Sequence, residues 1–258
     1  MKVQPVAFAA RPFGRVVSET PAFGVLARRP LAWAVALTAL QVLLGLAAGL
    51  AAKRFLPGVD PSLAALVLVS PLPFLILAVT GSWRAAGFSG PRGWQNLGLL
   101  VLPAIVSLVA PLLAGVKALP LETLGVLVFG YALTGLYEEA WSRGLILGLL
   151  RPLGDRRAVF LSAGLFAALH ATNFLFRNPA IVAAQMVGAF CFGVAFAALR
   201  LRTNALWLLM GLHLGHDLLL KLTGFPAIPL DVAQDAVLLF YALWLLRERR
   251  AAAVPATA

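Results

Sequence analysis

Residues 137–144, which read YEEAWSRG, place two carboxylates and an arginine inside a stretch that is otherwise almost wholly apolar. On a helix, Glu139 and Arg143 are four residues apart and can pair on one face. Glu138 points about 100° away around the same axis, so it has no local partner. A charge at membrane depth costs roughly 2.5–17 kcal/mol, and such residues are therefore rare and usually mark function. The stretch predicts a helix in which Glu138 meets its partners on other helices.

The composition of the 258-residue chain predicts a polytopic membrane protein of the all-α class. Hydrophobic residues make up 61% of the chain and charged residues 12%, and a soluble domain of this size could not bury so much apolar surface. The net charge of +11 would suggest nucleic acid in a soluble chain. Here most lysines and arginines lie between apolar runs, where they set orientation in the bilayer, so we expect no nucleic-acid partner. A single cysteine, Cys191, excludes an intramolecular disulfide and a cysteine-based zinc site.

Apolar runs predict a bundle of about eight transmembrane helices, judged against about 20 residues per crossing. The second run contains Pro71 and Pro73, which kink or interrupt a helix. The runs cover residues 31–52, 63–80, 97–115, 123–148, 157–174, 180–199, 204–221 and 228–246.

The basic residues predict that both termini are cytoplasmic. Sixteen of the 21 lysines and arginines fall on one side of an eight-span chain, in agreement with the positive-inside rule. Residues 1–30 then form a basic cytoplasmic arm, 31–246 one transmembrane domain, and 247–258 a cytoplasmic tail. The arm lacks the apolar core of a secretory signal. Four acidic residues are assigned to the opposite side and kept apart from any site: Asp60, Glu122, Asp231 and Asp235.

Few ionisable residues remain at membrane depth, and three of them share one level. Depth can be counted from the nearest cytoplasmic arginine at about 1.5 Å per residue, which gives roughly 20 Å for Glu138, 21 Å for His170 and 17 Å for His213. We therefore expect these three side chains to converge on one site.

Spacing within each helix agrees with such a site. Phe166 and His170 are four residues apart, as are His213 and Asp217, so each pair shares a helix face. His216 lies near the face of His213, and spacing alone does not exclude it. A carboxylate and two imidazoles can hold a water between them, and they supply the base, the orienting partner and the oxyanion donors that water activation needs.

Three motifs thus follow one another on separate apolar runs: Glu138-Glu139-x-x-x-Arg143, Phe166-x-x-x-His170 and His213-x-x-x-Asp217. In this order, within residues 123–220, they resemble the motifs of the CPBP family, which comprises type II CAAX prenyl endopeptidases, Abi proteins and bacteriocin-processing relatives. Ser142 departs from the pattern, because relatives commonly carry an aromatic residue before the arginine. Asp217 occupies a position that is Asn or Asp in relatives.

The resemblance implies an intramembrane protease that hydrolyses a peptide bond of a membrane peptide or protein. In the best-understood branch, the enzyme removes the last three residues of a prenylated CAAX tail. Glu138 would be the general base, assisted by His170, and His213 with Asp217 would bind or polarise the scissile carbonyl. The supporting residues would be Glu139 and Arg143, which hold their helix in register, and Phe166, which packs beneath His170.

Two mechanisms stay open at this level. Glu138, His170 and His213 supply the nitrogen and oxygen ligands that Zn²⁺ accepts with one open position for water, as in a metalloprotease. The chain has no His-Glu-x-x-His motif, and the same residues suit a glutamate mechanism without metal equally well.

Two other classes of function are compatible with ionisable residues at membrane depth. An ion-coupled transporter often shows interrupted helices in two related halves, whereas here the ionisable residues cluster between positions 138 and 217. A non-catalytic Abi-type immunity or interaction protein would carry the same motifs, and neither the substrate nor the oligomeric state follows from the sequence. We expect a multi-pass protein of a bacterial cytoplasmic membrane, with its site facing the cytoplasmic half.

Overall fold

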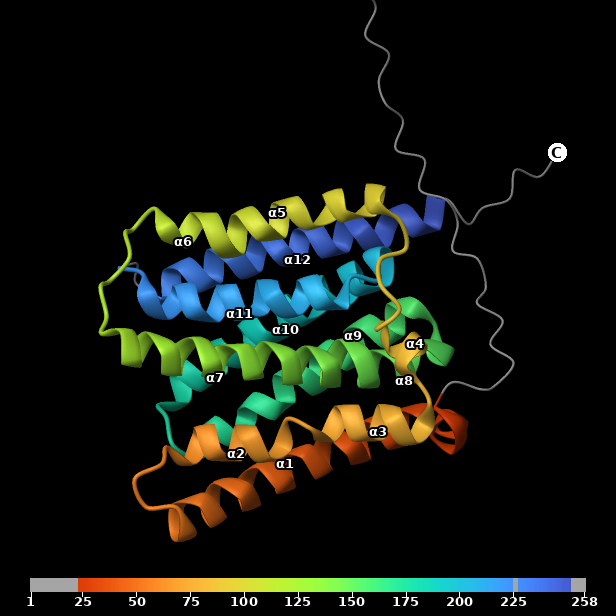
Figure 1. The fold of residues 1–258 in the computed structure, drawn as a ribbon. Coiled ribbons are helices and arrows are strands. Elements are labelled where there is room, and N and C mark those ends of the chain that lie inside the picture. The colour runs from red at the N-terminus through yellow and green to blue at the C-terminus, as the bar shows by residue number, and fades with distance from the viewer. Residues whose placement is uncertain (1–22, 225–226, 252–258) are drawn as a thin grey trace, which may run out of the picture.

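The computed structural model describes residues 23–224 and 227–251, and the regular secondary structure of these residues is entirely helical. Most of the predicted amino-terminal arm and the end of the predicted tail lie outside the described residues. Figure 1 shows the helices gathered in one bundle. Their bounds are η1 Gly24–Arg28, α1 Pro30–Phe55, α2 Pro61–Val69, α3 Leu72–Thr80, α4 Trp83–Ala86, η2 Trp94–Leu100, α5 Val101–Ala104, η3 Ile105–Val109, α6 Ala110–Leu112, α7 Leu121–Glu139, η4 Ala140–Ile146, α8 Leu147–Leu150, η5 Arg151–Leu153, α9 Asp155–Leu169, η6 His170–Leu175, α10 Pro179–Thr203, α11 Leu206–Leu222 and α12 Ala227–Ala251.

Each of the eight predicted apolar runs forms a helical rod, and several rods combine more than one helix type. The all-helical class is confirmed. Five rods among the described residues are long and apolar enough to cross a membrane, which supports an integral membrane protein; the count of eight crossings and the side of the termini stay predictions. The five are Pro30–Phe55, Pro61–Thr80, Trp94–Leu112, Asp155–Leu175 and Pro179–Thr203.

Proline interrupts the second rod, as the sequence predicts. Helix α2 ends at Val69 and α3 begins at Leu72, with Pro71 at the break. A proline removes a backbone donor and its ring clashes with the preceding turn, so the helix restarts rather than continues.

Helix α10 runs through the centre of the bundle, where it packs on α9 and on α12. Its carboxyl-terminal half is buried on all sides, from Cys191 to Leu201. In Figure 1, α1, α2 and α3 form one edge of the bundle and α5, α6 and α12 the opposite edge, with α7 and α11 between them. Large apolar side chains such as Leu43, Val79 and Phe240 are exposed on the outside, where a bilayer would cover them.

Helices α7 and α11 pack directly on each other, and Gly135 allows their backbones to come close together. A Cβ at this position would lie 2.7 Å from the Met210 carbonyl oxygen and 3.1 Å from the Leu214 nitrogen. Glycine therefore lets the two backbones approach, as small residues do between membrane helices. This contact sets Glu138 and Glu139, one turn further along α7, against His213 of α11.

Candidate functional site

The two adjacent carboxylates lie where α7 passes into a π-helical turn. Helix α7 ends at Glu139, and η4 continues it without a break over Ala140–Ile146. Single π-helical turns within α-helices occur frequently at functional sites. Every residue of η4 is buried, so neighbouring helices surround this turn.

Glu139 and Arg143 pair as their spacing predicts, with 2.9 Å between Oε1 and Nη1. Both side chains are almost fully buried. The Arg143 guanidinium also lies over the Phe166 ring, 4.2 Å from its centroid, a favourable cation–π arrangement. A buried charge needs such partners, because one left uncompensated is strongly destabilising.

Glu139 also holds His213 of α11. The Nδ1 of His213 lies 2.8 Å from Glu139 Oε1, and both side chains are buried. Because a carboxylate can only accept, Nδ1 carries the proton of this hydrogen bond. The family resemblance implies that Glu139 holds its own helix in register; the structure gives it a second contact, which fixes the ring orientation of the histidine.

The other ring nitrogen of His213 faces two further carboxylates. Its Nε2 lies 3.8 Å from Glu138 Oε2 and 3.6 Å from Asp217 Oδ2. The structure thus brings together Glu138, His213 and Asp217, which come from two motifs and two helices. Glu138 keeps 23% of its side-chain surface exposed, in contrast to its buried neighbour.

His170 lies where α9 ends and η6 begins. Its Nδ1 is 3.0 Å from the Phe166 carbonyl oxygen, so Nδ1 carries the proton and Nε2 presents a lone pair. Phe166 also contacts the imidazole edge-on, with 5.1 Å between ring centroids. This agrees with the packing role expected of Phe166.

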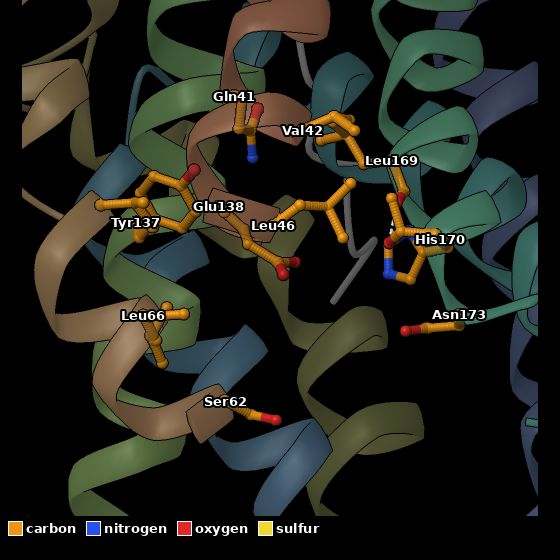
Figure 2. A pocket seen from close by; sticks show the side chains of 14 residues that line it. Gln41, Val42, Leu46, Ser62, Leu66, Tyr137, Glu138, Leu169, His170 and Asn173 are labelled. Atoms are coloured by element: carbon orange, nitrogen blue, oxygen red, sulfur yellow. Dashed lines mark hydrogen bonds between the residues drawn. The ribbon is translucent and has the colours of Figure 1, made fainter. Parts of the chain in front are cut away.

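Glu138 and His170 line one cavity of about 320 Å³. Figure 2 shows both side chains reaching into this cavity from different helices, with Asn173 beside the imidazole. Asn173 donates a hydrogen bond to Gln185 Oε1 at 2.8 Å, which orients its amide. We call this space the Glu138 cavity.

The first rods, which carry no recognisable motif, supply part of the Glu138 cavity wall. Gln41 of α1 and Ser62 of α2 are among its lining residues. Gln41 is buried, and its Oε1 has no hydrogen-bond partner among the described residues. The sequence signal for Gln41 is an isolated amide within the apolar run 31–52, and such a signal is weak on its own.

A second cavity of about 160 Å³ adjoins the first, since His170 lines both. We call it the acidic cavity. It lies between α10, α11 and α12, and its polar lining residues are His170, Gln185, His213, His216, Asp217, Asp231 and Asp235.

Two of these residues correct an expectation from the sequence. The charge pattern of the sequence places Asp231 and Asp235 apart from the site, but in the structure these two residues of α12 line the same cavity as His213 and Asp217. His216 Nε2 lies 3.6 Å from Asp231 Oδ1, which also gives His216 a defined place. The signal that could have found them is their spacing of four residues inside a predicted span, which puts both on one helix face.

The arrangement does not form a ready metal site. Among the described residues, no three side chains of His, Cys, Asp or Glu are grouped so that they could hold a metal ion. The structure therefore does not arrange the expected zinc ligands, Glu138, His170 and His213, around one metal position. Zinc dependence stays a prediction from the sequence.

Residues 120–219 match the family model of Rce1-like type II CAAX prenyl endopeptidases. The matched segment contains all three motifs from Glu138 to Asp217, so the resemblance seen in the sequence is confirmed over this part of the chain. Neither the curated proteins nor the solved structures yield a match. Helix α1 and helix α12, which complete the two cavities, lie outside the matched segment.

Proposed function

From the Rce1-like segment at residues 120–219 and the geometry around it, we propose that the protein is an intramembrane endopeptidase. Its substrate is a membrane-associated peptide or protein, with prenylated CAAX tails as the first class to test. The observation that carries the proposal is that Glu138 and His170 line one cavity while His213 lies 3.8 Å from the Glu138 carboxylate. A general base (Glu138), a second hydrogen-bond acceptor for water (His170) and a hydrogen-bond donor for the substrate carbonyl (His213) are thus neighbours.

The first step is activation of water in the Glu138 cavity. Glu138 offers carboxylate oxygens and His170 offers the lone pair of Nε2, so one water can donate a proton to each. Its oxygen lone pairs are then free to attack a carbonyl carbon. Glu138 takes the proton as general base, and as the resulting acid it protonates the departing amine.

The second requirement is stabilisation of the oxyanion that forms on the carbonyl. Glu139 fixes the His213 ring through Nδ1, which leaves Nε2 directed toward Glu138 and Asp217. When doubly protonated, the ring can donate from Nε2 to the carbonyl oxygen. Removing one such donor typically costs about 10²–10³ in rate.

Hydrolysis by purified, reconstituted protein tests the proposal. Farnesylated CAAX peptides are incubated with the wild type, with Glu138→Gln and with Glu122→Gln, and the products are identified by mass spectrometry. We expect cleavage by the wild type and by the Glu122 variant, whose exposed carboxylate at the start of α7 lies away from the cavities. For Glu138→Gln we expect a loss of about 10²–10⁴. Undiminished cleavage by a folded Glu138→Gln protein would falsify the assignment.

A chelator separates the two mechanisms that the sequence left open. The proposed mechanism uses side chains alone, so activity should survive dialysis against a zinc chelator. Loss of activity that added Zn²⁺ restores would instead identify a metalloprotease.

A further inference from the structure

We propose that the acidic cavity is a subsite for a cationic side chain, lysine or arginine, of the substrate peptide. This rests on the proposed function, which it deepens by naming a feature of the substrate. The cavity is bounded by α12, which lies outside the segment that matches the protease family. Selectivity for such a side chain would therefore depend on residues of α12, outside the catalytic motifs that match the family.

The carboxylates of the acidic cavity outnumber their partners. Asp217 lies 3.6 Å from His213, and Asp231 lies 3.6 Å from His216. Asp235 is only 8% exposed and has no hydrogen-bond or ion-pair partner within residues 23–224 and 227–251. The lining residues include no lysine or arginine. Because a buried carboxylate without a partner is costly, the cavity favours a cation from outside.

Gly188 of α10 makes room for this cluster. A Cβ at position 188 would lie 2.5 Å from Asp235 Oδ2 and 3.7 Å from Asp231 Oδ2. Any side chain here would displace the Asp235 carboxylate from its position against α10. Glycine at position 188 therefore leaves room for the Asp235 carboxylate of α12, and this carboxylate contributes to the negative charge of the cavity.

The shape of the cavity suits a single long cationic side chain. Its volume of about 160 Å³ is below the roughly 300–1,000 Å³ of pockets that enclose whole small ligands. Apolar walls come from Phe166, Ala189, Phe192 and Leu220, along which the methylene stem of a lysine can pack while its charged head meets the carboxylates. No group of side chains in the described residues is arranged to hold a metal ion, so the geometry favours an organic cation.

The acidic cavity lies beside the proposed reaction centre. His170 lines both cavities, and His213 lines the acidic cavity while it contacts Glu138. A side chain bound against Asp235 would therefore belong to a residue close to the scissile bond. The subsite would position the backbone of the peptide and select its sequence.

The subsite can be tested by peptide binding to an inactive variant, so that the test does not depend on hydrolysis of the peptide. The full chain with Glu138→Gln is reconstituted and titrated with farnesylated CAAX peptides in which each position in turn carries lysine or norleucine, an apolar side chain of similar length. At one position we expect lysine to bind about tenfold more tightly than norleucine, the scale of a close buried charge pair. Equal binding of lysine and norleucine at every position overturns the proposal.

Variants of the cavity then assign the preference to its residues. Asp235→Asn should abolish the lysine preference, and Gly188→Ala should weaken it, while Glu122→Gln should leave it unchanged. If the Asp235 variant fails to fold, Asp231→Asn decides, because its side chain is 36% exposed and less involved in packing. An undiminished lysine preference in a folded Asp235→Asn protein, or in a folded Asp231→Asn protein where the Asp235 variant does not fold, overturns the subsite. A preserved preference in a wild-type protein that cleaves nothing would instead overturn the protease and leave the subsite standing.

Discussion

Glu138 and Glu139 are chemically identical neighbours whose surroundings differ completely. Glu139 is buried between Arg143 and His213, whereas Glu138 lies at a cavity and keeps part of its surface free. The spacing of Glu139 and Arg143 was enough to separate the two roles, because a helix turns about 100° per residue. The hydrogen bond from His213 to Glu139 could not be foreseen, since it depends on how α7 and α11 pack.

Substitution of Glu139→Gln tests whether Glu139 positions His213. An amide offers a neutral oxygen and two donors in place of an anionic acceptor, so the His213 ring loses the partner that fixes its proton on Nδ1. We expect kcat to fall by at least about tenfold with little change in KM, as when the carboxylate that orients a catalytic histidine is replaced. The measurement is steady-state hydrolysis of a peptide by the reconstituted variant.

A thermal-unfolding scan accompanies this measurement, because the change also leaves the buried Arg143 without its anionic partner. Loss of one member of a buried pair costs about 3–5 kcal/mol, so a lower Tm is expected as well. A folded Glu139→Gln protein with wild-type kcat would show that His213 needs no help from this carboxylate.

The contact of α7 with α11 decides whether the motifs meet. Gly135→Ala introduces a Cβ 2.7 Å from the Met210 carbonyl oxygen, so the two helices must move apart. We expect a destabilisation of about 1–3 kcal/mol, the usual cost of overpacking, together with lower activity. Unfolding titrations and hydrolysis rates measure both effects.

Gly125→Ala on the same helix is the matched control. A Cβ at position 125 meets no heavy atom within 4 Å, and alanine favours a helix over glycine by about 0.5–1 kcal/mol. This variant should be as stable as the wild type or slightly more so. Equal behaviour of the two alanine variants would contradict the close packing of α7 on α11.

The positions of the helices could be predicted from the sequence, but their rotations about their own axes could not. Apolar runs located all eight helical rods, and the proline pair marked the break between α2 and α3, because burial in lipid and backbone chemistry are local properties. Asp231 and Asp235 face the site because of the way α12 is rotated against α10. Their spacing puts both on one face of α12, but no local pattern specifies which way that face points. The same holds for Gln41, whose place at the Glu138 cavity follows from the packing of α1.

Large apolar side chains cover the outside of the bundle, as expected for a protein in a bilayer. The predicted orientation can be tested because the chain has a single cysteine, Cys191, which is buried. In a Cys191→Ala background, Ala258→Cys provides one labelling site at the carboxyl terminus. Positive-inside charge placement predicts that an impermeant maleimide labels it only in inverted vesicles, and labelling in intact cells would contradict that orientation.

In the proposed mechanism, Glu138 and His170 act on one water. A double-mutant cycle tests this joint action directly, with hydrolysis rates measured for Glu138→Gln, His170→Ala and the double variant. Residues that act as a unit are strongly non-additive, so the double variant should be about as slow as the slower single variant. Losses that multiply in the double variant, or single variants that keep the wild-type rate, would contradict a shared site.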